Sequence, residues 1–353
     1  MIKILFIIPS LKAYGGSERI ISEIANYSSL RKNIEVHLVL LIKGEKFYEL
    51  NKTIILHEPS FNHKEYPRIV FTLKILKYLR NLFRKIKPDA VLSFDEMYNS
   101  FVLLASLFLN IRIFISDRSQ PGRDWGIFHN NLKKVLYPAS YGIIAQTLIA
   151  KEILYKQTKH KNIIVIPNPI KQINAKSELK EKIILNVGRL IKSKRQDLLL
   201  RIFSRTNNVG WKLFIAGDGP EKENLVLLAK SLGIIDQVIF VGNIKNIESL
   251  YIKSRIFAFT SNSEGFPNAL GEAMSASNAV ISFNCVAGPS ELIEDGISGF
   301  LIKEDNIEEY IFKLQLLMYD ETICKSFGEK AREKVKELSI EIIGNKFIKT
   351  LTE

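Results

Sequence analysis

The sequence predicts an α/β protein with two domains, each built on a parallel sheet flanked by helices. Short apolar runs rich in Ile, Val and Phe alternate with amphipathic segments of helical period along nearly the whole chain. These runs are apolar at successive positions, as in strands buried on both faces of a parallel sheet. The length of 353 residues suits two domains of ordinary size. We expect residues 1–170 to form the first domain and 171–339 the second, joined through Pro167, Pro169 and a polar linker over 171–181.

The composition is typical of a globular protein from a reducing compartment. Hydrophobic residues make up 46% of the chain, which disfavours disorder. The two cysteines, Cys285 and Cys324, have neither metal-binding nor disulfide spacing. The apolar start is too short for a signal peptide, and the apolar run 102–109 ends at Asn110, well before the length of a membrane span. We therefore expect a cytoplasmic protein, soluble or peripheral to a membrane.

The positive charge lies almost entirely in the first half of the chain. The formal net charge is +13, and residues 1–170 hold 25 Lys and Arg against 13 Asp and Glu. Such asymmetry predicts a polyanionic partner for the first half: nucleic acid, anionic lipid or a phosphorylated substrate. No zinc-finger, helix-turn-helix or RNP-like pattern accompanies the charge, so we expect no nucleic-acid partner.

The first predicted strand, residues 4–8, leads into a glycine turn and an amphipathic helix. The adjacent Gly15 and Gly16 would let the backbone approach a ligand closely. The dinucleotide fingerprint Gly-x-Gly-x-x-Gly is absent, which argues against a dehydrogenase. Taken alone, the turn is equally consistent with a purely structural role.

A long amphipathic helix is predicted over residues 66–87, after strands at 36–42 and 54–56. Its apolar residues recur with helical spacing and form one face. A basic stripe lies beside that face, formed by Lys74, Lys77, Arg80, Arg84 and Lys87. Two interpretations stay open: a solvated charged face, or contact with membrane phosphates or a lipid-linked diphosphate.

Two further predicted strands, 88–94 and 112–116, deliver polar residues to their carboxyl ends. Asp95 and Glu96 follow the first strand, and Asp117 and Arg118 follow the second. Ligands of open α/β sheets lie beyond those ends. Strands at 140–147 and 163–166 then complete the first domain.

The second half opens with a strand at 183–187, followed by cationic residues. Gly188, Arg189 and Lys194 lie just beyond the strand end, where a guanidinium and an ammonium group suit a diphosphate. The same strand, turn and helix unit recurs over 211–221 and again from residue 238.

Residues 261–300 contain two carboxylates in a distinctive setting. An apolar strand at 256–259 is followed by a glycine turn and a helix start, which expose backbone N–H groups and the positive end of a helix dipole. Glu264 and Glu272 would repel phosphate there, but each carboxylate can accept two hydrogen bonds from a sugar diol. The alternative is that both are solvated acids at a helix start.

The spacing of these glutamates, with Gly-Phe-Pro after the first, resembles the signature of family-4 retaining glycosyltransferases. The turn at 15–19, the Gly-Arg-Leu-x4-Lys element and residues 288–301 match other parts of that pattern. The strand sequences ending in Leu-Ser-Phe and Ile-Ser-Asp-Arg-Ser resemble the N-acetylgalactosaminyltransferase-like subgroup that extends lipid-linked oligosaccharides and O-antigens. The resemblance implies the GT-B fold, in which two Rossmann-like domains with parallel sheets face a central cleft. It also implies that the C-terminal helix 340–353 packs back on the first domain.

The resemblance implies a role for each matching residue. Arg189, Lys194 and Glu264 would be catalytic, with the cations neutralising the donor diphosphate and Glu264 binding the hydroxyls of the donor sugar. Glu272 would bind the ribose diol. The other implied donor-binding residues are Gly15, Gly16, Gly188, Asn243, Ile244, Gly265, Phe266, Pro267, Asn268 and Ala269.

On the acceptor side, the resemblance implies that Asp117, Arg118 and the basic stripe meet the acceptor or the membrane. Many relatives have Glu at the place of Asp117, and some have an active-site His where Arg118 stands. His129 is one candidate replacement, although a histidine in a surface loop is the simpler interpretation.

These inferences predict a retaining glycosyltransferase that needs no metal or other cofactor. The chain has no Asp-x-Asp pair, the usual carboxylate site for a divalent metal, so cations must neutralise the leaving diphosphate. We expect transfer of a hexose or N-acetylhexosamine from a nucleotide sugar, preferably a UDP-sugar, to a polyprenyl-diphosphate-linked saccharide at the inner face of the cytoplasmic membrane. The alternatives are a nucleotide-sugar epimerase of the same fold and a non-catalytic, basic membrane-binding protein.

Overall fold

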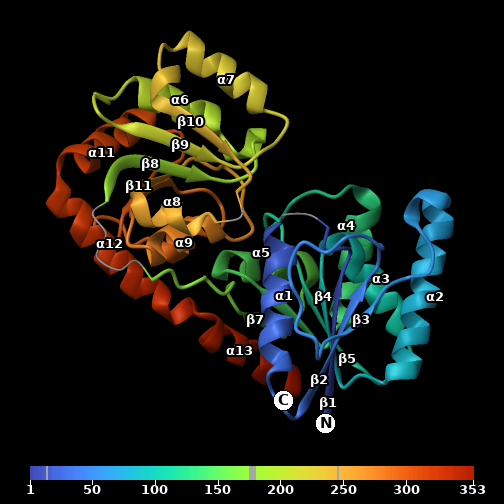
Figure 1. Ribbon diagram of the computed structural model, residues 1–353. Coiled ribbons are helices and arrows are strands. Elements are labelled where there is room, and N and C mark those ends of the chain that lie inside the picture. The colour runs from blue at the N-terminus through green and yellow to red at the C-terminus, as the bar shows by residue number, and fades with distance from the viewer. Residues whose placement is uncertain (13–14, 175–179, 245) are drawn as a thin grey trace. The chain divides into compact units, whose positions relative to one another are not determined.

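The computed structural model describes residues 1–12, 15–174, 180–244 and 246–353. Tyr14 of the glycine turn and residues 175–179 of the expected linker lie outside the described residues. The chain divides into two compact units, which we call unit 1 (residues 1–169 with 340–353) and unit 2 (residues 170–339). Each unit is a parallel sheet flanked by helices, so the predicted α/β class with two Rossmann-like domains is confirmed (Figure 1).

The sheet of unit 1 has, within the described residues, seven parallel strands in the order β3-β2-β1-β4-β5-β6-β7. Strand β1, which pairs with β2 and β4, is buried from Ile4 to Ile8, which explains why the sequence runs apolar there without alternation. The strands are β1 Ile2–Ile8, β2 Ile34–Leu40, β3 Ile55–His57, β4 Ala90–Phe94, β5 Arg112–Ser116, β6 Gly142–Ala145 and β7 Ile163–Val165.

The helices of unit 1 pack on both faces of that sheet. The last helix of the chain lies beside α1 (Figure 1), and Nη2 of Arg31 donates to Oδ1 of Asn345 at 2.8 Å. A Cβ at Gly344 would lie 2.4 Å from the ring of Tyr27, so glycine allows this close approach. The helices are α1 Gly16–Ser29, α2 Arg68–Ile86, α3 Glu96–Ser106, α4 Ile127–Leu136, α5 Leu148–Thr158 and α13 Ile340–Thr352.

Helix α2 shows the predicted apolar face, with slightly different ends. Phe71, Ile75, Leu79, Phe83 and Ile86 are buried against the rest of unit 1. The helix ends where the residue after Ile86 adopts a left-handed conformation with φ of 51°. The next residue is a proline, which disfavours a helical conformation in the residue before it.

Unit 2 repeats the design with six parallel strands, again within the described residues, in the order β10-β9-β8-β11-β12-β13. The strands are β8 Glu181–Val187, β9 Lys212–Ala216, β10 Val238–Gly242, β11 Ser254–Phe259, β12 Ala279–Phe283 and β13 Phe300–Ile302. The helices are α6 Gln196–Ser204, α7 Lys222–Ser231, α8 Glu248–Lys253, α9 Asn268–Ser275, α10 Pro289–Leu292, α11 Ile307–Tyr319 and α12 Glu321–Val335. A separate 3-10 turn, Lys336–Leu338, follows α12 directly.

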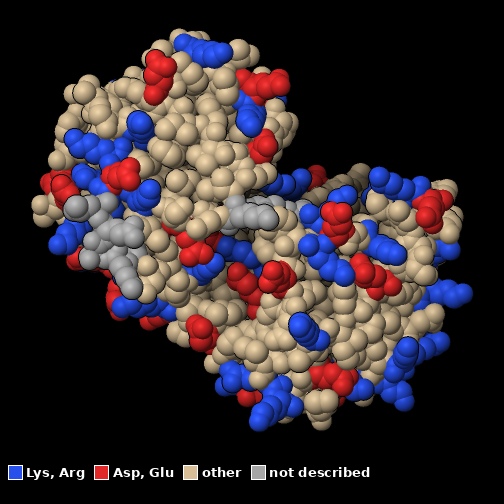
Figure 2. All heavy atoms as spheres, viewed as in Figure 1, with Lys and Arg blue, Asp and Glu red and all other residues tan. Residues whose placement is uncertain are grey.

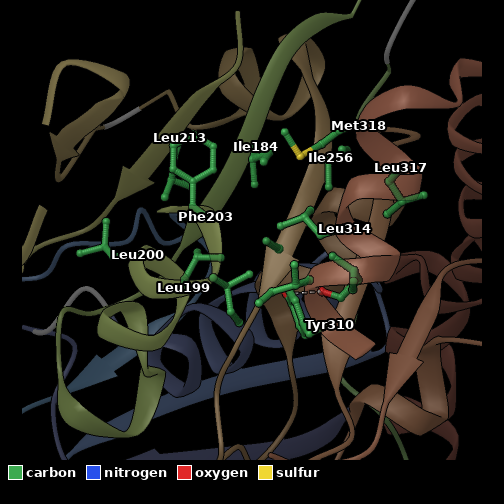
Figure 3. Close-up of a cluster of buried hydrophobic side chains, with 14 of the residues drawn as sticks. Ile184, Leu199, Leu200, Phe203, Leu213, Ile256, Tyr310, Leu314, Leu317 and Met318 are labelled. Carbon is green, nitrogen blue, oxygen red and sulfur yellow. Dashed lines mark hydrogen bonds between the residues drawn. The ribbon is translucent and has the colours of Figure 1, made fainter. Parts of the chain in front are cut away.

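A large apolar core fixes the strands of unit 2 against α6 and α11 (Figure 3). Phe203 and Leu213 meet Ile256 and Leu314 in this cluster, and all four are fully buried. The hydroxyl of buried Tyr310 donates to the carbonyl of Ile281 at 3.2 Å, which satisfies the one polar atom of its side chain. Burial of these apolar surfaces is the main force that sets the strand ends in place.

Candidate functional site

The loops that follow β8, β9 and β10 are tied together at one edge of unit 2. The amide of Gly188 donates to the carbonyl of Ala216 at 3.0 Å. The amide of Leu190 donates to the carbonyl of Asp218, also at 3.0 Å. The amide of Gly217 donates to the carbonyl of Gly242 at 2.9 Å. The predicted donor-binding loops therefore share the edge of the sheet where ligands of α/β proteins bind.

Two glycines that the sequence analysis did not single out make this contact possible. Gly217 has a φ of 135°, and a Cβ there would lie only 2.0 Å from the carbonyl oxygen of Gly188. A Cβ at Gly219 would lie 2.4 Å from the carbonyl oxygen of Leu190. The signal was present as a Gly-Asp-Gly-Pro turn after a strand, but a turn by itself does not reveal which backbone it approaches.

Lys194 and Glu264 form an ion pair beside this edge. Nζ of Lys194 lies 2.5 Å from Oε1 of Glu264, and the two side chains are only 19% and 9% exposed. Lys194 ends the 3-10 turn Lys192–Lys194 after β8, whereas Glu264 follows β11. The structure thus joins two predicted site residues that are 70 positions apart in the sequence. An ammonium group has three donors, so the pair leaves Lys194 able to bind an anionic group as well.

Hydrogen bonds from the β11 loop hold Lys194 in place. Oγ1 of buried Thr260 donates to the carbonyls of Lys194 and Arg195, at 3.0 and 3.1 Å. The amide of Asn262 donates to the carbonyl of Ser193 at 3.0 Å. Because the same loop carries Glu264, the two halves of the ion pair are fixed relative to each other.

Arg189 lies in the same loop as Lys194 but is exposed. Its carbonyl accepts a hydrogen bond from Nε2 of Gln196 at 3.1 Å, which anchors the backbone. Among the described residues, no carboxylate lies within ion-pair distance of its guanidinium. Its charge is therefore directed to solvent at the loop edge, where a diphosphate can meet it.

Glu272 is buried in α9, and its carboxylate has a defined partner. The hydroxyl of Tyr251 donates to Oε2 of Glu272 at 3.1 Å, and the tyrosine itself is fully buried. Because Glu272 is only 7% exposed, it is not a solvated acid at a helix start. Tyr251 was missed because an aromatic residue in a short helix before a strand is indistinguishable from a core residue in the sequence.

A half-buried lysine secures the backbone around Tyr251. Nζ of Lys180 donates to the carbonyl of Ala276 at 2.9 Å and to that of Ser254 at 3.1 Å. Nδ2 of Asn278 donates to the carbonyl of Tyr251 at 2.9 Å. Burial lowers the pKa of Lys180 to about 8, since the charged ammonium is costly away from water.

The start of α9 provides fewer free N–H groups than expected. The amide of Asn268 already donates to the carbonyl of Phe266 at 3.0 Å, and both Phe266 and Pro267 are buried. Gly265 and Ala269 are partly exposed. A Cβ at Gly288 would lie 2.1 Å from Cδ of Pro267, so the loop before α10 packs directly on this turn.

Cys285 lies in that loop and is not a nucleophile. Burial, with the Glu264 carboxylate nearby, raises the pKa of its thiol to about 12. The thiol is therefore protonated at neutral pH, and only the thiolate is reactive.

Asn243 and Ile244 follow directly after β10 and complete the predicted donor residues of unit 2. Asn243 is exposed and Ile244 is half-buried. The residue after them, Lys245, lies outside the described residues.

In unit 1 the predicted glycine turn begins α1. Gly15 is the residue before the helix, and its carbonyl accepts hydrogen bonds from the Tyr48 hydroxyl and the Arg19 amide, both at 3.2 Å. A Cβ at Gly15 would lie 2.1 Å from Oε2 of Glu18, so the first turn of the helix folds back over this glycine. Gly16 is exposed at the helix start.

Asp117 and Arg118, expected on the acceptor side, are tied into unit 1. Oδ2 of Asp117 lies 2.7 Å from Nζ of Lys133, and its Oδ1 accepts from the Tyr137 hydroxyl at 2.7 Å. Arg118 is buried, with its guanidinium donating to Asn168 and stacked 4.2 Å from the Phe94 ring centroid. Burial lowers the pKa of Arg118 to about 9.

Asp95 stands out at the carboxyl end of β4. Its φ of 138° is rare for a residue other than glycine, and such strain is concentrated at functional sites. Burial and the neighbouring Glu96 raise the pKa of Asp95 to about 7. The sequence signal was an acidic residue at a strand end, but nothing in it distinguished Asp95 from Glu96.

The basic stripe of α2 divides into residues with structural contacts and residues exposed to solvent. Nη1 of Arg80 donates to the carbonyls of Ala105 and Leu107, at 3.1 and 3.0 Å, at the end of α3. Nζ of Lys74 lies 4.3 Å from the ring centroid of Tyr66. Lys and Arg side chains gather along the edge of unit 1 where α2 lies (Figure 2), and those exposed in the stripe are Lys77, Arg84 and Lys87.

Neither a membrane-spanning helix nor a metal-binding cluster occurs in the part of the chain that the structure describes. No described helix is long and apolar enough to span a bilayer. The described His, Cys, Asp and Glu side chains form no group of three that could hold a metal ion.

His129 lies in α4 rather than in a loop, with Nε2 at 3.4 Å from Nη2 of Arg68. Burial lowers the pKa of this histidine.

Models of two protein families match the chain. The family described as glycosyl transferases group 1 matches residues 169–334, and glycosyltransferase family 4 matches residues 14–172.

Two Campylobacter jejuni enzymes are similar over nearly their full length. One, named N-acetylgalactosamine-N,N'-diacetylbacillosaminyl-diphospho-undecaprenol 4-alpha-N-acetylgalactosaminyltransferase, is 30% identical over 341 residues, covering 91% of this chain and 92% of the relative. The other, a GalNAc-alpha-(1->4)-GalNAc-alpha-(1->3)-diNAcBac-PP-undecaprenol alpha-1,4-N-acetyl-D-galactosaminyltransferase, is 29% identical over 363 residues, covering 100% and 99%.

Solved structures confirm the predicted GT-B fold. The structure of Staphylococcus aureus TarM in complex with UDP and saccharide ligands superimposes with a TM-score of 0.82 at 16% identity, covering all of both chains. The structure of Anabaena HepE in complex with UDP superimposes with a TM-score of 0.83 at 17% identity, covering 99% of this chain and 100% of that one.

Proposed function

Because the chain belongs to the group-1 and family-4 glycosyltransferases, we propose that it moves a hexose or N-acetylhexosamine from a UDP-sugar to a polyprenyl-diphosphate-linked saccharide, with retention of configuration. The observation that carries the proposal is the strand-end edge of unit 2, where a fixed Lys194–Glu264 pair lies beside exposed Arg189. Both Campylobacter relatives are named for acceptors that are carried on undecaprenol. HepE binds UDP and UDP-glucose, which supports a UDP-sugar donor. The reaction belongs to bacterial polysaccharide or lipid-linked glycan assembly.

The cations of unit 2 would stabilise the leaving diphosphate. Cleavage of the bond between the sugar and the β-phosphate leaves negative charge on phosphate oxygens. Lys194 is already fixed by the β11 loop, so it loses little freedom when it meets that charge. Preorganised charges of this kind supply a large part of a catalytic effect. Arg189, which is exposed, would close on the diphosphate from the same loop.

The two glutamates would recognise different parts of the donor. Glu272 is proposed to bind the ribose diol, and the hydroxyl bond from Tyr251 keeps one carboxylate oxygen oriented. Tyr251 is therefore a positioning residue that acts through Glu272. Glu264 is proposed to bind hydroxyls of the donor sugar while it holds Lys194.

Retention would follow from reaction on one face of the sugar. The acceptor hydroxyl attacks from the side that the diphosphate leaves, and a leaving phosphate oxygen takes the hydroxyl proton. This scheme needs no protein nucleophile, and the protonated thiol of Cys285 offers none.

A donor panel in the presence of EDTA tests the proposal. The purified chain is incubated with UDP- and GDP-sugars and a polyprenyl-diphosphate-linked saccharide, and the product is examined by mass spectrometry and NMR. We expect an α-linked product from one UDP-sugar, formed equally well with EDTA. Inversion at C2 of UDP-GlcNAc without transfer would identify an epimerase. A β-linked product, or loss of activity with EDTA, would contradict retention or metal independence.

A further inference from the structure

Large apolar side chains are exposed on the first turns of α2 and α4. Ile69 and Leu73 of α2 are 77% and 60% exposed, and Ile127 and Phe128 of α4 are 82% and 63% exposed. Single exposed apolar residues are ordinary, but adjacent ones indicate an interaction site. We call these four residues the apolar end of unit 1.

Contacts between the two helices bring these first turns together. Nη2 of Arg68, at the start of α2, lies 3.4 Å from Nε2 of His129 in α4. The ring of His129 in turn packs edge-on against that of Phe128, with centroids 5.4 Å apart. Figure 1 shows the bluer, N-terminal end of α2 and α4 near the same end of unit 1. The four apolar side chains thus belong to one region of the surface.

This region lies at the carboxyl ends of the strands. Helices in such folds run back against the strands, so their first turns lie where the strands end. In α4 it is the last turn that contacts a strand end, because Lys133 pairs with Asp117, which follows β5, so this helix also reaches the same edge. Ligands of α/β sheets bind at the same edge.

The two helices that carry the apolar end hold only basic charged residues. Neither α2 nor α4 contains an Asp or Glu, whereas the two helices together carry Arg68, Lys74, Lys77, Arg80, Arg84, Lys85, Lys133 and Lys134. Ile69, Leu73 and Lys77 follow one another at intervals of four, so the outward face of α2 changes from apolar to basic. Exposed apolar side chains flanked by lysines are the pattern of helices that lie in a membrane interface.

We propose that the apolar end inserts into an anionic bilayer, with Ile69, Leu73, Ile127 and Phe128 below the phosphates and Lys77 beside them. The proposal rests on the proposed function, since a membrane at this end would present a lipid-linked acceptor to the edge where β4 and β5 finish. Arg84 lies fifteen residues after Ile69, about 22 Å along the helix axis. The far end of the basic stripe is then too distant to share the insertion.

A second copy of the chain is the other possible occupant. A symmetric dimer through this surface would bring two helix pairs without acidic residues together, and like charges repel. Anionic lipid instead complements both the apolar residues and the cations.

Vesicle binding by the full-length chain tests the proposal. The triple variant Ile69→Ser, Leu73→Ser, Phe128→Ser is compared with Val209→Ser, Leu227→Ser, Phe312→Ser, which removes exposed apolar side chains from unit 2. Binding to phosphatidylcholine vesicles containing phosphatidylglycerol is measured by sedimentation at low and high salt. We expect the first variant to bind roughly tenfold or more weakly, most clearly at high salt, and the control to bind like wild type. Equal binding by all three proteins would overturn the proposal.

Two further measurements separate the alternatives. Phe128→Trp is compared with Phe312→Trp for quenching by brominated lipid, and only the first should be quenched; absence of quenching would contradict insertion. Light scattering without lipid should show the same mass for wild type and the triple variant. A wild-type dimer that the triple substitution dissociates would favour a second copy of the chain as the occupant.

Transfer to a short, water-soluble acceptor should be unaffected by the triple variant. Failure of all transfer with normal vesicle binding would reject the proposed function and leave the membrane surface standing.

Discussion

The two units share one architecture but use the edge at the strand ends differently. In unit 2 this edge holds a fixed Lys194–Glu264 pair and a carboxylate, Glu272, oriented by a buried tyrosine. In unit 1 the polar side chains at the corresponding edge are buried or already paired. Arg118 is buried, and Asp117 has three partners. What unit 1 exposes instead is an apolar end beside basic residues. From this comparison we predict that unit 2 recognises one defined small molecule, whereas unit 1 binds a broader surface.

The largest expected effect is on Lys194, the fixed cation of unit 2. Lys194→Ala should lower kcat roughly 100-fold, because a preorganised charge that meets the leaving diphosphate is lost. Lys192→Ala, an exposed lysine in the same turn, is the matched control and should leave kcat within about twofold of wild type. Steady-state kinetics with a saturating donor measure both. Wild-type turnover in the Lys194 variant would show that the fixed cation of unit 2 takes no part in catalysis.

The second expected effect distinguishes the ligand-binding roles of the two glutamates of unit 2. Glu272→Gln should weaken binding of both UDP and the UDP-sugar, because the ribose occurs in each. Glu264→Gln should weaken binding of the UDP-sugar more than binding of UDP, and lower its turnover. Calorimetry with the two ligands measures the difference. Equal losses for both ligands in both variants would show that the carboxylates do not act separately.

The third effect concerns the tyrosine that orients Glu272. Tyr251→Phe should raise KM and the Kd for UDP roughly tenfold and leave kcat nearly unchanged, since one hydrogen bond to the carboxylate is lost. Tyr310→Phe is the control, because its buried hydroxyl bonds a backbone carbonyl elsewhere in unit 2. That variant should lose stability without a change in KM. The same kinetic change in both variants would mean that Tyr251 only supports the fold.

The fourth effect sharpens the description of unit 1. Arg80→Ala should lower the free energy of unfolding by about 1–2 kcal/mol, because two carbonyls at the end of α3 lose their donor. Lys77→Ala, exposed on the same helix, should change it by less than about 0.5 kcal/mol. Urea unfolding measures both. A larger loss for Lys77 than for Arg80 would reverse the division of the stripe into structural and exposed residues.

The smallest effect is a pH dependence from Asp95. The pKa of this carboxyl is raised from 3.8 to about 7, so between those values the folded chain holds a proton that the unfolded chain releases. The folded state is thus stabilised by this group at low pH, and the contribution is lost as the pH rises toward 7. Asp95→Asn should therefore gain roughly 1–2 kcal/mol more stability at pH 8 than at pH 5, after allowance for partial exposure.

The control for Asp95 is an exposed aspartate of unit 1. Hydrogen bonds from the Gly126 amide and from Asn130 lower the pKa of Asp124, so this carboxylate is ionised throughout the range between pH 5 and pH 8. Urea unfolding of Asp124→Asn should show no difference between the two pH values. A gain for Asp95→Asn that is equally large at both values would mean relief of backbone strain rather than loss of a titrating group.

Features that depend on a local pattern could be predicted from the amino-acid sequence. Continuous apolar runs predicted parallel strands because both faces of such strands are buried. Glycine turns after β1 and β8 predicted close-approach loops, and the spacing of Glu264 and Glu272 predicted the family and its fold. Each of these signals lies within a short segment, so no knowledge of distant partners was needed.

Contacts between side chains from different elements could not be predicted from the sequence. Tyr251 and Glu272 are 21 residues apart, and Arg80 caps carbonyls 25 and 27 residues away. Their pairing depends on how helices settle on the sheet, which a linear pattern does not encode. The same holds for the apolar end of unit 1, because helical periodicity identifies an apolar face but cannot tell which of its residues the neighbouring elements leave uncovered.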